Sequence, residues 1–204
     1  MSIYQLKSRF QDVLRPVTRY CHARGITANQ VTLLACFVSV LLGLMLAIFH
    51  TQSGLFALLP IWMGLRMALN AIDGMLAREF HQQSHLGAYL NELCDLISDV
   101  ALYLPFALLS SVSPLLVLLV VILALISEYA GVLGKLVGAT RRYDGPMGKS
   151  DRAFVFGLLG IAVAVDLPLF WVNGCLLLMA ILLLRTTQNR VKNGIKEVAS
   201  TTVQ

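Results

Sequence analysis

The sequence predicts an all-α integral membrane protein with six transmembrane helices, preceded by an amphipathic helix that lies at the membrane interface. Hydrophobic residues make up 57% of the 204 residues and charged residues only 13%, and the mean hydropathy is +0.75. Soluble domains carry about 25% charged residues, so this chain has too few polar side chains to cover a soluble surface. We therefore expect one membrane domain over residues 1–204, with an interfacial helix at 1–24, a six-span bundle at 25–185 and a basic cytosolic tail at 186–204.

Residues 1–24 have the spacing of an amphipathic helix. Apolar side chains recur on one side, and basic side chains mark the other side. The apolar positions are Ile3, Leu6, Phe10, Val13, Leu14 and Val17, and the basic positions are Lys7, Arg9, Arg15 and Arg19. Such a helix lies along the headgroup region instead of crossing the bilayer, so we expect it to rest on the membrane surface.

Six apolar segments follow, and we expect each of them to cross the bilayer as a helix. They run over residues 31–49, 54–78, 87–109, 115–137, 153–166 and 167–184. Thr27 or Asn29 is expected to cap the first of them, and Pro105 to kink the third. Glu128 lies inside the fourth span, where an acidic side chain is costly unless it has a partner.

The distribution of basic residues predicts the orientation. Lys and Arg lie in the N-terminal segment, near alternate span ends and in the C-terminal tail, whereas the loops at 50–53, 110–114 and 166–168 contain none. The positive-inside rule then places both termini in the cytosol, in a membrane such as the bacterial inner membrane. These flanking residues also explain the net charge of +5, so we expect contacts with membrane lipid headgroups and no binding of nucleic acid.

The polar residues between 66 and 99 fall on two helical faces, which a break at 80–84 separates. The first face contains Arg66, Asn70, Asp73, Gly74 and Ala77, and the second contains Gly87, Asn91, Asp95 and Asp99, with Glu92 at its edge. Two antiparallel helices joined by this short break bring the faces together and collect carboxylate and amide oxygens in one pocket. Oxygen donors of this kind suit hard cations such as Mg²⁺, Ca²⁺ or Mn²⁺.

The same geometry predicts the register of the two helices. We expect Asn70 to face Asp95 across the antiparallel pair. One turn further along each helix, Arg66 then lies level with Asp99. A lone arginine at this depth is penalised by about 2.5 to 3.5 kcal/mol, so we expect these two residues to form an ion pair. In the alternative, Asp99 is a further metal ligand that compensates for Asn91.

The segment from Asn70 to Asp95 resembles the signature of the CDP-alcohol phosphatidyltransferases, D-x2-D-G-x2-A-R-x8-G-x3-D-x3-D. The spacing matches throughout, although Asn70 and Asn91 replace the first and third aspartates. The positions that agree are Asp73, Gly74, Ala77, Arg78, Gly87 and Asp95. The resemblance implies a role in phospholipid biosynthesis, in which a substituted phosphate such as a phosphatidyl group passes from a CDP-linked lipid, for example CDP-diacylglycerol, to an alcohol acceptor. CMP is released, and a homodimer is a reasonable hypothesis for such a protein.

The resemblance also implies roles for individual residues. Asp95 and Asp73 are the expected catalytic residues, and Asp95 is the base that accepts the proton of the acceptor hydroxyl. One or two ions of Mg²⁺ or Mn²⁺ are expected on Asn70, Asp73, Asn91 and Asp95, with Glu92 or Asp99 as further candidates. The residues expected to contact the CDP-lipid donor are Arg66, Gly74, Ala77, Arg78 and Gly87.

Two further basic residues lie before the fifth span. Lys149 and Arg152 follow a loop that contains Gly145, Pro146 and Gly148, and this loop can bend the chain toward the pocket. We expect the two side chains to bind a phosphate of the donor or of the acceptor.

Two other functions fit the sequence. Because Asn70 and Asn91 supply neutral oxygens where carboxylates would supply charge, the chain can be a catalytically reduced protein that binds a nucleotide-linked lipid. Buried acids such as Glu128 also fit a small transporter. Release of CMP from a CDP-linked lipid separates the enzyme from both alternatives.

Overall fold

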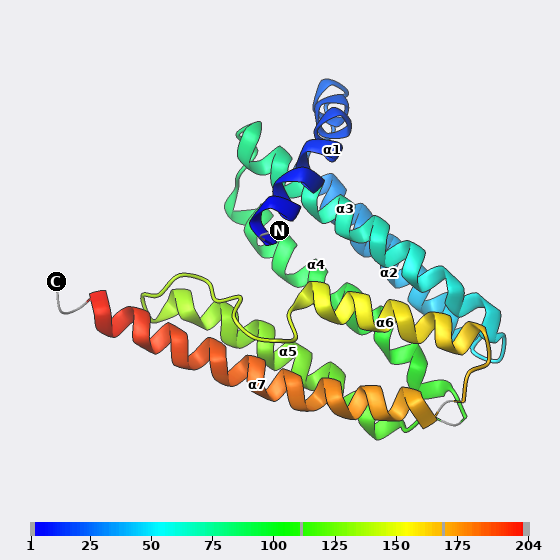
Figure 1. Ribbon diagram of the computed structural model, residues 1–204. Coiled ribbons are helices and arrows are strands. Elements are labelled where there is room, and N and C mark those ends of the chain that lie inside the picture. The colour runs from blue at the N-terminus through cyan, green and yellow to red at the C-terminus, as the bar shows by residue number, and fades with distance from the viewer. Residues whose placement is uncertain (1–2, 111, 169, 202–204) are drawn as a thin grey trace. The chain divides into compact units, whose positions relative to one another are not determined.

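The computed structural model describes residues 3–110, 112–168 and 170–201, and over these residues the regular elements are helices. Figure 1 follows them from the N-terminus in blue to the C-terminus in red. In chain order they are α1 (Ile3–Ala23), α2 (Ala28–Ile48), the 3₁₀ helix η1 (Ser53–Ala57), α3 (Leu58–Glu79), α4 (His85–Tyr103), the 3₁₀ helix η2 (Leu104–Leu108), α5 (Pro114–Leu136), α6 (Lys149–Ala164) and α7 (Phe170–Thr201). The predicted all-helical fold is confirmed.

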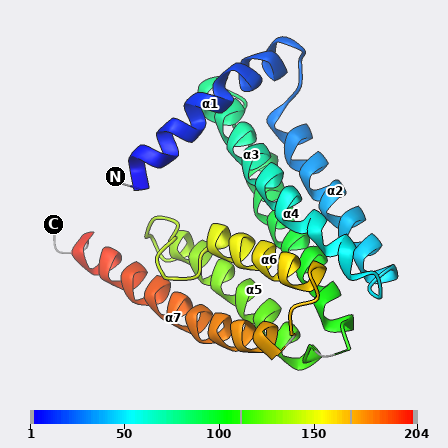
Figure 2. The ribbon, with the colours of Figure 1, turned by 45° about the vertical axis from the view of Figure 1, so that its right-hand side comes forward.

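The chain forms two compact units. The first unit consists of Met1–Leu44 and Ile61–Leu102, and the second consists of Met45–Pro60 and Tyr103–Gln204. The first unit therefore contains α1 and most of α2, α3 and α4. In the second unit α5 and α7 lie side by side, as Figures 1 and 2 both show. A single domain over residues 1–204 stays a prediction.

Helix α1 has the predicted amphipathic character. The side chains of Val13 and Val17 are exposed, whereas Thr18 is fully buried. On the buried side, Leu14 packs against a core that includes Leu76 of α3. One face of α1 thus contacts the rest of the first unit, and the apolar face that it leaves exposed is the kind that lies against lipid in interfacial helices.

A capping box starts α2. Thr27 Oγ1 accepts a hydrogen bond from the backbone N–H of Gln30 at 3.3 Å, and Gln30 Oε1 accepts one from the N–H of Thr27 at 2.9 Å. The helix therefore begins at Ala28, and Thr27 rather than Asn29 is its cap. The N–H of Ala28 donates to Gln82 Oε1 at 2.7 Å, which ties the break after α3 to the start of α2.

Helices α2 and α4 approach each other closely at Gly43, inside the first unit. A Cβ atom on Gly43 would overlap the carbonyl oxygen of Ala101. A residue without a side chain therefore lets the two backbones touch, as small residues do where membrane helices cross.

Four helical segments are long and apolar enough to cross a membrane, counted over the described residues alone. They are Ala28–Ile48, Ser53–Glu79, Pro114–Leu136 and Phe170–Ser200. The other two predicted spans correspond to α4 and α6. Helix α4 carries Glu92, Asp95 and Asp99, and α6 is only 16 residues long, so length and composition alone do not mark either helix as a span.

Aromatic side chains hold α6 in the second unit. The ring of Tyr103 stacks on Phe156, with ring centroids 3.7 Å apart and an interplanar angle of 7°. Phe106 meets the same ring edge-on at 5.3 Å. Phe106 belongs to η2, where the α-helical turns of α4 have given way to 3₁₀ turns around Pro105, the residue that the sequence predicts as a kink.

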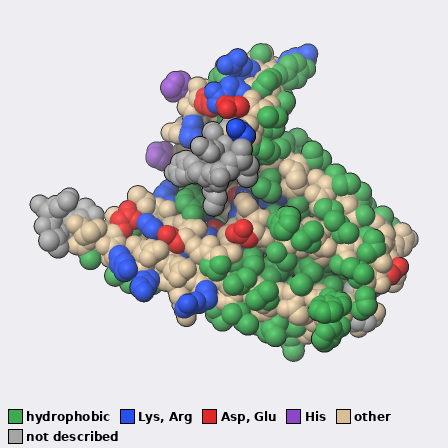
Figure 3. Space-filling view, viewed as in Figure 1, with side chains coloured by type: hydrophobic (Ala, Val, Ile, Leu, Met, Phe, Trp, Pro, Cys, Tyr) green, Lys and Arg blue, Asp and Glu red, His purple; other side chains and the backbone are tan. Residues whose placement is uncertain are grey.

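Helix α7 is 32 residues long and includes the segment that the sequence predicts as a basic tail. The tail is helical over its described part, 186–201, and Lys and Arg side chains gather along this C-terminal end of α7 (Figure 3). Thr186 and Arg190 are buried there, at 0% and 2% exposure. At about 1.5 Å per residue, α7 is longer than the roughly 30 Å hydrocarbon core of a bilayer.

Candidate active site on α3 and α4

Arg66 of α3 and Asp99 of α4 form a buried ion pair in the first unit. Arg66 Nη1 lies 2.6 Å from Asp99 Oδ1, and the two residues are 3% and 4% exposed. The predicted pair, and with it the predicted register of the two helices, is confirmed. Each residue neutralises the other at a position where an unpaired charge would be strongly destabilising.

Asp95 lies one turn before Asp99 on α4 and receives hydrogen bonds from α3. Arg66 Nη2 donates to the backbone carbonyl of Asp95 at 2.9 Å and approaches Oδ1 at 3.5 Å. Asn70 Nδ2 approaches the same Oδ1 at 3.4 Å, so Asn70 faces Asp95 as predicted. The side chain of Asp95 is 21% exposed and thus accessible to a substrate.

Asp73 is positioned by a residue that lies outside the predicted site. Its Oδ2 accepts a hydrogen bond of 2.7 Å from the hydroxyl of Thr32 on α2, and both residues are buried. Thr32 lies one turn after the start of α2, in an otherwise apolar run. A polar side chain in that place is the signal that would have drawn attention to it.

The two glycines of the signature leave room for neighbouring side chains of the protein. A Cβ on Gly74 would lie 3.1 Å from Arg78 Nη2, so the glycine allows the guanidinium to lie against α3. A Cβ on Gly87 would lie 2.8 Å from Asn29 Oδ1. Asn29, which the sequence suggests only as a helix cap, is therefore a neighbour of the signature glycine.

Three further predicted site residues lie on the same two helices. Asn91, Glu92 and Ala77 are half-buried. Over the described residues, no group of three or more His, Cys, Asp and Glu side chains is arranged to hold a metal ion. A divalent cation would therefore depend on the carboxylates of Asp73 and Asp95 with amide oxygens. These hard oxygen donors fit Mg²⁺ or Mn²⁺.

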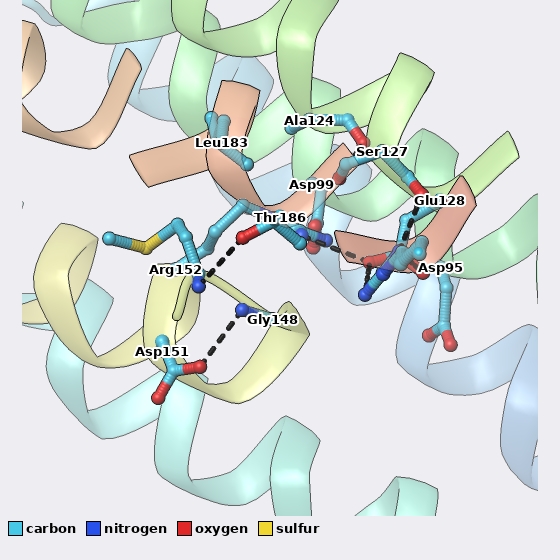
Figure 4. A network of polar contacts seen from close by, with 12 residues as sticks. Asp95, Asp99, Ala124, Ser127, Glu128, Gly148, Asp151, Arg152, Leu183 and Thr186 are labelled. Atoms are coloured by element: carbon cyan, nitrogen blue, oxygen red, sulfur yellow. Dashed lines mark hydrogen bonds and ion pairs between the residues drawn. The ribbon is translucent and has the colours of Figure 1, made fainter. Parts of the chain in front are cut away.

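Glu128 of α5 is the centre of a charge cluster within the second unit (Figure 4). Its carboxylate accepts a hydrogen bond from Arg152 Nη1 at 3.0 Å, and it lies 3.2 Å from Arg190 Nη1 and 3.4 Å from Arg141 Nη2. Arg152 and Arg190 are 1% and 2% exposed. Three guanidinium groups thus gather around one carboxylate, and guanidinium groups are the donors that bind phosphate most strongly in proteins.

The sequence predicts Arg152 and Lys149 at a phosphate site but not Arg190. Lys149 is the first residue of α6 and is half-buried, next to Gly148, whose N–H donates to Asp151 Oδ2 at 2.9 Å (Figure 4). Arg190 lies in the segment predicted as a tail. Its spacing of four residues from Thr186 is the signal that a helix continues and directs both side chains inward.

A model of the CDP-alcohol phosphatidyltransferase family matches residues 25–186, which include both helices of the site. The chain belongs to this family. Over 194 residues it is 47% identical to the inner membrane protein YnbA of Escherichia coli (strain K12), a match that covers 95% of this chain and 96% of that protein. Over 119 residues it is 30% identical to the archaetidylinositol phosphate synthase of Aeropyrum pernix, which covers 52% of this chain and 61% of that protein.

Two solved structures of the phosphatidylinositol phosphate synthase PgsA1 of Mycobacterium tuberculosis share the fold of this chain. The complex with manganese and citrate has a TM-score of 0.72 at 21% identity and covers 88% of this chain and 87% of that chain. The structure with CDP-DAG bound has a TM-score of 0.71 at 22% identity and covers 90% and 92%. The CDP-alcohol phosphatidyltransferase signature itself lies on α3 and α4, wholly within the first unit.

Proposed function

We propose that the chain transfers a substituted phosphate, such as a phosphatidyl group, from a CDP-linked lipid to an alcohol acceptor and releases CMP. The observation that carries this proposal is the antiparallel pairing of α3 and α4, which places Asn70 of the family signature opposite Asp95. PgsA1, a member of the same fold, has CDP-DAG bound in one of its structures. The reaction belongs to phospholipid biosynthesis.

In the proposed reaction, Asp95 takes the proton of the acceptor hydroxyl while the hydroxyl oxygen attacks the phosphorus that carries the lipid. The bond from this phosphorus to the oxygen of CMP breaks, and CMP leaves with that oxygen. Proton transfer to a positioned carboxylate contributes about a hundred- to ten-thousand-fold in rate. The accessible, hydrogen-bonded carboxylate of Asp95 fits this role.

The donor and a cation would be held by neighbouring residues of the signature. Asp73 and Asp95, with amide oxygens, would bind Mg²⁺ or Mn²⁺, and the bound cation would neutralise the diphosphate. The guanidinium of Arg78, which Gly74 accommodates, would pair with a donor phosphate. Lys149 and Arg152 would bind a phosphate of the donor or acceptor, a role that the guanidinium groups gathered around Glu128 support.

The membrane arrangement is part of the proposal. Helices α2 to α7 would form six spans in a bacterial inner membrane, with both termini and the active site on the cytosolic side. The basic residues at the cytosolic span ends, and their absence from the loops at 50–53, 110–114 and 166–168, support this orientation. The protein would act as a homodimer surrounded by membrane lipids.

One assay tests the proposed reaction. The purified protein in lipid nanodiscs is incubated with CDP-diacylglycerol, Mg²⁺ or Mn²⁺ and a panel of alcohols, and released CMP is measured. We expect metal-dependent CMP release that Asp73→Ala and Asp95→Ala abolish without unfolding the protein. The control is Asp12→Ala on the exposed surface of α1, where 67% of the side chain is accessible. Normal turnover in either site variant would contradict the assignment.

Asn70 and Asn91 favour a second candidate, a binder of CDP-linked lipid without turnover. In the same assay this protein would bind CDP-diacylglycerol stoichiometrically and release no CMP. Movement of a substrate across sealed vesicles without cleavage would instead indicate the transporter.

A further inference from the structure

We propose that Arg66 and Asn70 are positioning residues that hold Asp95 by hydrogen bonding, so that the site binds one divalent cation per chain. This inference rests on the proposed function for the role of Asp95. It gives the two residues roles other than the predicted ones, which are metal ligand for Asn70 and donor contact for Arg66.

The contacts to Asp95 come from two turns of α3. The short bond, 2.9 Å, runs from Arg66 Nη2 to the backbone carbonyl of Asp95, and it holds the turn of α4 in register. The longer contacts, 3.5 Å from Arg66 Nη2 and 3.4 Å from Asn70 Nδ2, converge on one carboxylate oxygen, Oδ1. Both the backbone and the side chain of Asp95 are therefore fixed by donors from α3.

Arg66 can serve two acids because a guanidinium has several donors in a rigid fork. Its Nη1 group binds Asp99 and its Nη2 group binds Asp95. At 3% exposure, the guanidinium lies within the helix pair rather than at the surface. This placement fits a residue that orients Asp95 better than one that meets a large lipid donor.

An aspartate at position 70 would change the electrostatics of the contact. It would bring a second carboxylate to the place where an amide nitrogen now lies, 3.4 Å from Asp95 Oδ1. Two carboxylates at such a distance repel each other unless a cation or a proton lies between them. Asn70 removes the need for a cation there, because its nitrogen donates to the carboxylate directly.

The charge balance of the helix pair agrees with one cation. Asp73, Asp95 and Asp99 carry three negative charges and Arg66 carries one positive charge, which leaves two negative charges. One Mg²⁺ or Mn²⁺ neutralises the sum of these four charges.

The other charged side chains of α3 and α4 leave this balance unchanged. Arg78 and Glu92 carry opposite charges, which add up to zero. Glu79 pairs with Arg15 of α1 at 3.3 Å.

Counting bound Mn²⁺ tests the proposal directly. The purified protein in nanodiscs is titrated with Mn²⁺, and free and bound ions are separated by electron paramagnetic resonance. We expect one tightly bound ion per wild-type chain. In Asn70→Asp we expect a second bound ion or about tenfold tighter binding of the first, since cation affinity rises with ligand charge.

The matched control is Asn193→Asp in the second unit. Asn193 Nδ2 also donates to an aspartate, Asp144 Oδ1 at 3.0 Å, so the variant creates the same kind of carboxylate contact between α7 and the segment that precedes α6. Because Arg142 already donates to both carboxylate oxygens of Asp144, this variant should leave the Mn²⁺ count and affinity of the wild type unchanged. Two ions per wild-type chain would overturn the proposal, and so would an Asn70→Asp variant with the wild-type count and affinity.

Arg66→Lys tests the positioning role separately from a structural one. The lysine keeps the charge opposite Asp99 but lacks the second arm that reaches Asp95. We expect kcat to fall about tenfold or more with an unchanged KM for the donor, because misplacing a catalytic group affects the chemical step. A raised KM with an unchanged kcat would instead mean that Arg66 binds the donor. The Mn²⁺ count requires no turnover. It therefore tests the proposed binding of one cation even if the wild-type protein releases no CMP.

Discussion

The hydroxyl of Thr32 donates a hydrogen bond of 2.7 Å to the carboxylate of Asp73, and this bond joins α2 to α3 inside the first unit. Asp73 is only 3% exposed, so its orientation depends on such neighbours rather than on water. Losing a residue that orients a metal ligand typically weakens metal binding by about ten- to a hundredfold. Thr32 thus adds a residue of a third helix, α2, to a site whose signature lies on α3 and α4.

Thr32→Val is expected to weaken Mn²⁺ binding by about ten- to a hundredfold, the usual effect of losing a partner of a metal ligand. The valine has nearly the shape of threonine but cannot donate to Asp73. Mn²⁺ titration of the purified variant measures the change. Thr187→Val is the matched control, since the hydroxyl of Thr187 donates to the Leu183 carbonyl within α7. Equal affinities in wild type and Thr32→Val would show that this bond does not orient a ligand.

Asp99→Ala is expected to destabilise the protein by about 3 to 5 kcal/mol, because it leaves the buried guanidinium of Arg66 opposite an alanine. The double variant Arg66→Leu, Asp99→Ala should be less destabilised, since it removes the buried guanidinium together with its acidic partner Asp99. Unfolding in nanodiscs or mixed micelles measures both free energies. If Asp99→Ala keeps wild-type stability and loses Mn²⁺ affinity, then Asp99 is a metal ligand rather than the partner of Arg66.

Asp144, in the segment between α5 and α6, should make stability depend on pH. Arg142 donates to its carboxylate at 2.8 and 2.9 Å and Asn193 at 3.0 Å. These donors, Arg142 above all, lower the pKa of Asp144 although partial burial opposes them. A lowered pKa stabilises the folded protein above the unfolded value of about 3.9, and this stabilisation is lost as the pH falls through the folded value.

Asp144→Asn should therefore melt at a lower temperature than the wild type at pH 7, and the difference should shrink below about pH 4. Melting temperatures recorded between pH 7 and pH 3 measure it. A difference that stays constant over this range would mean that the charge of Asp144 contributes nothing to stability.

The register of α3 and α4 could be predicted because these helices are regular and follow one another through a short break. Helical periodicity then determines which side chains face each other, and Arg66 met Asp99 as expected. The bonds of Thr32 to Asp73 and of Arg190 to Glu128 could not be predicted in this way. Their partners lie 41 and 62 residues away in the sequence, and periodicity indicates a buried face without indicating which helix covers it.

The C-terminal half of α7 shows the same limit. Its basic composition predicts a cytosolic tail, but the helix continues because polar contacts hold it. Glu197 accepts hydrogen bonds from the backbone N–H and the hydroxyl of Thr140, at 2.9 and 3.0 Å, and pairs with Arg142. Arg190 donates to the Ser127 carbonyl at 2.6 Å. Such contacts belong to the tertiary structure, and the local sequence does not carry them.

The backbone contact at Gly43 limits which residues this position can accept. Replacing a helical glycine by alanine gains about 1 kcal/mol of helix propensity, yet a methyl group at Gly43 would force α2 away from the Ala101 carbonyl on α4. Thr32 and Asp95 would move apart with their helices. In a library of alanine substitutions selected for CMP release, Gly43 should therefore be as depleted as the carboxylates of the site. Gly64 on α3, which has no atom within 4 Å of a built Cβ, should accept alanine freely.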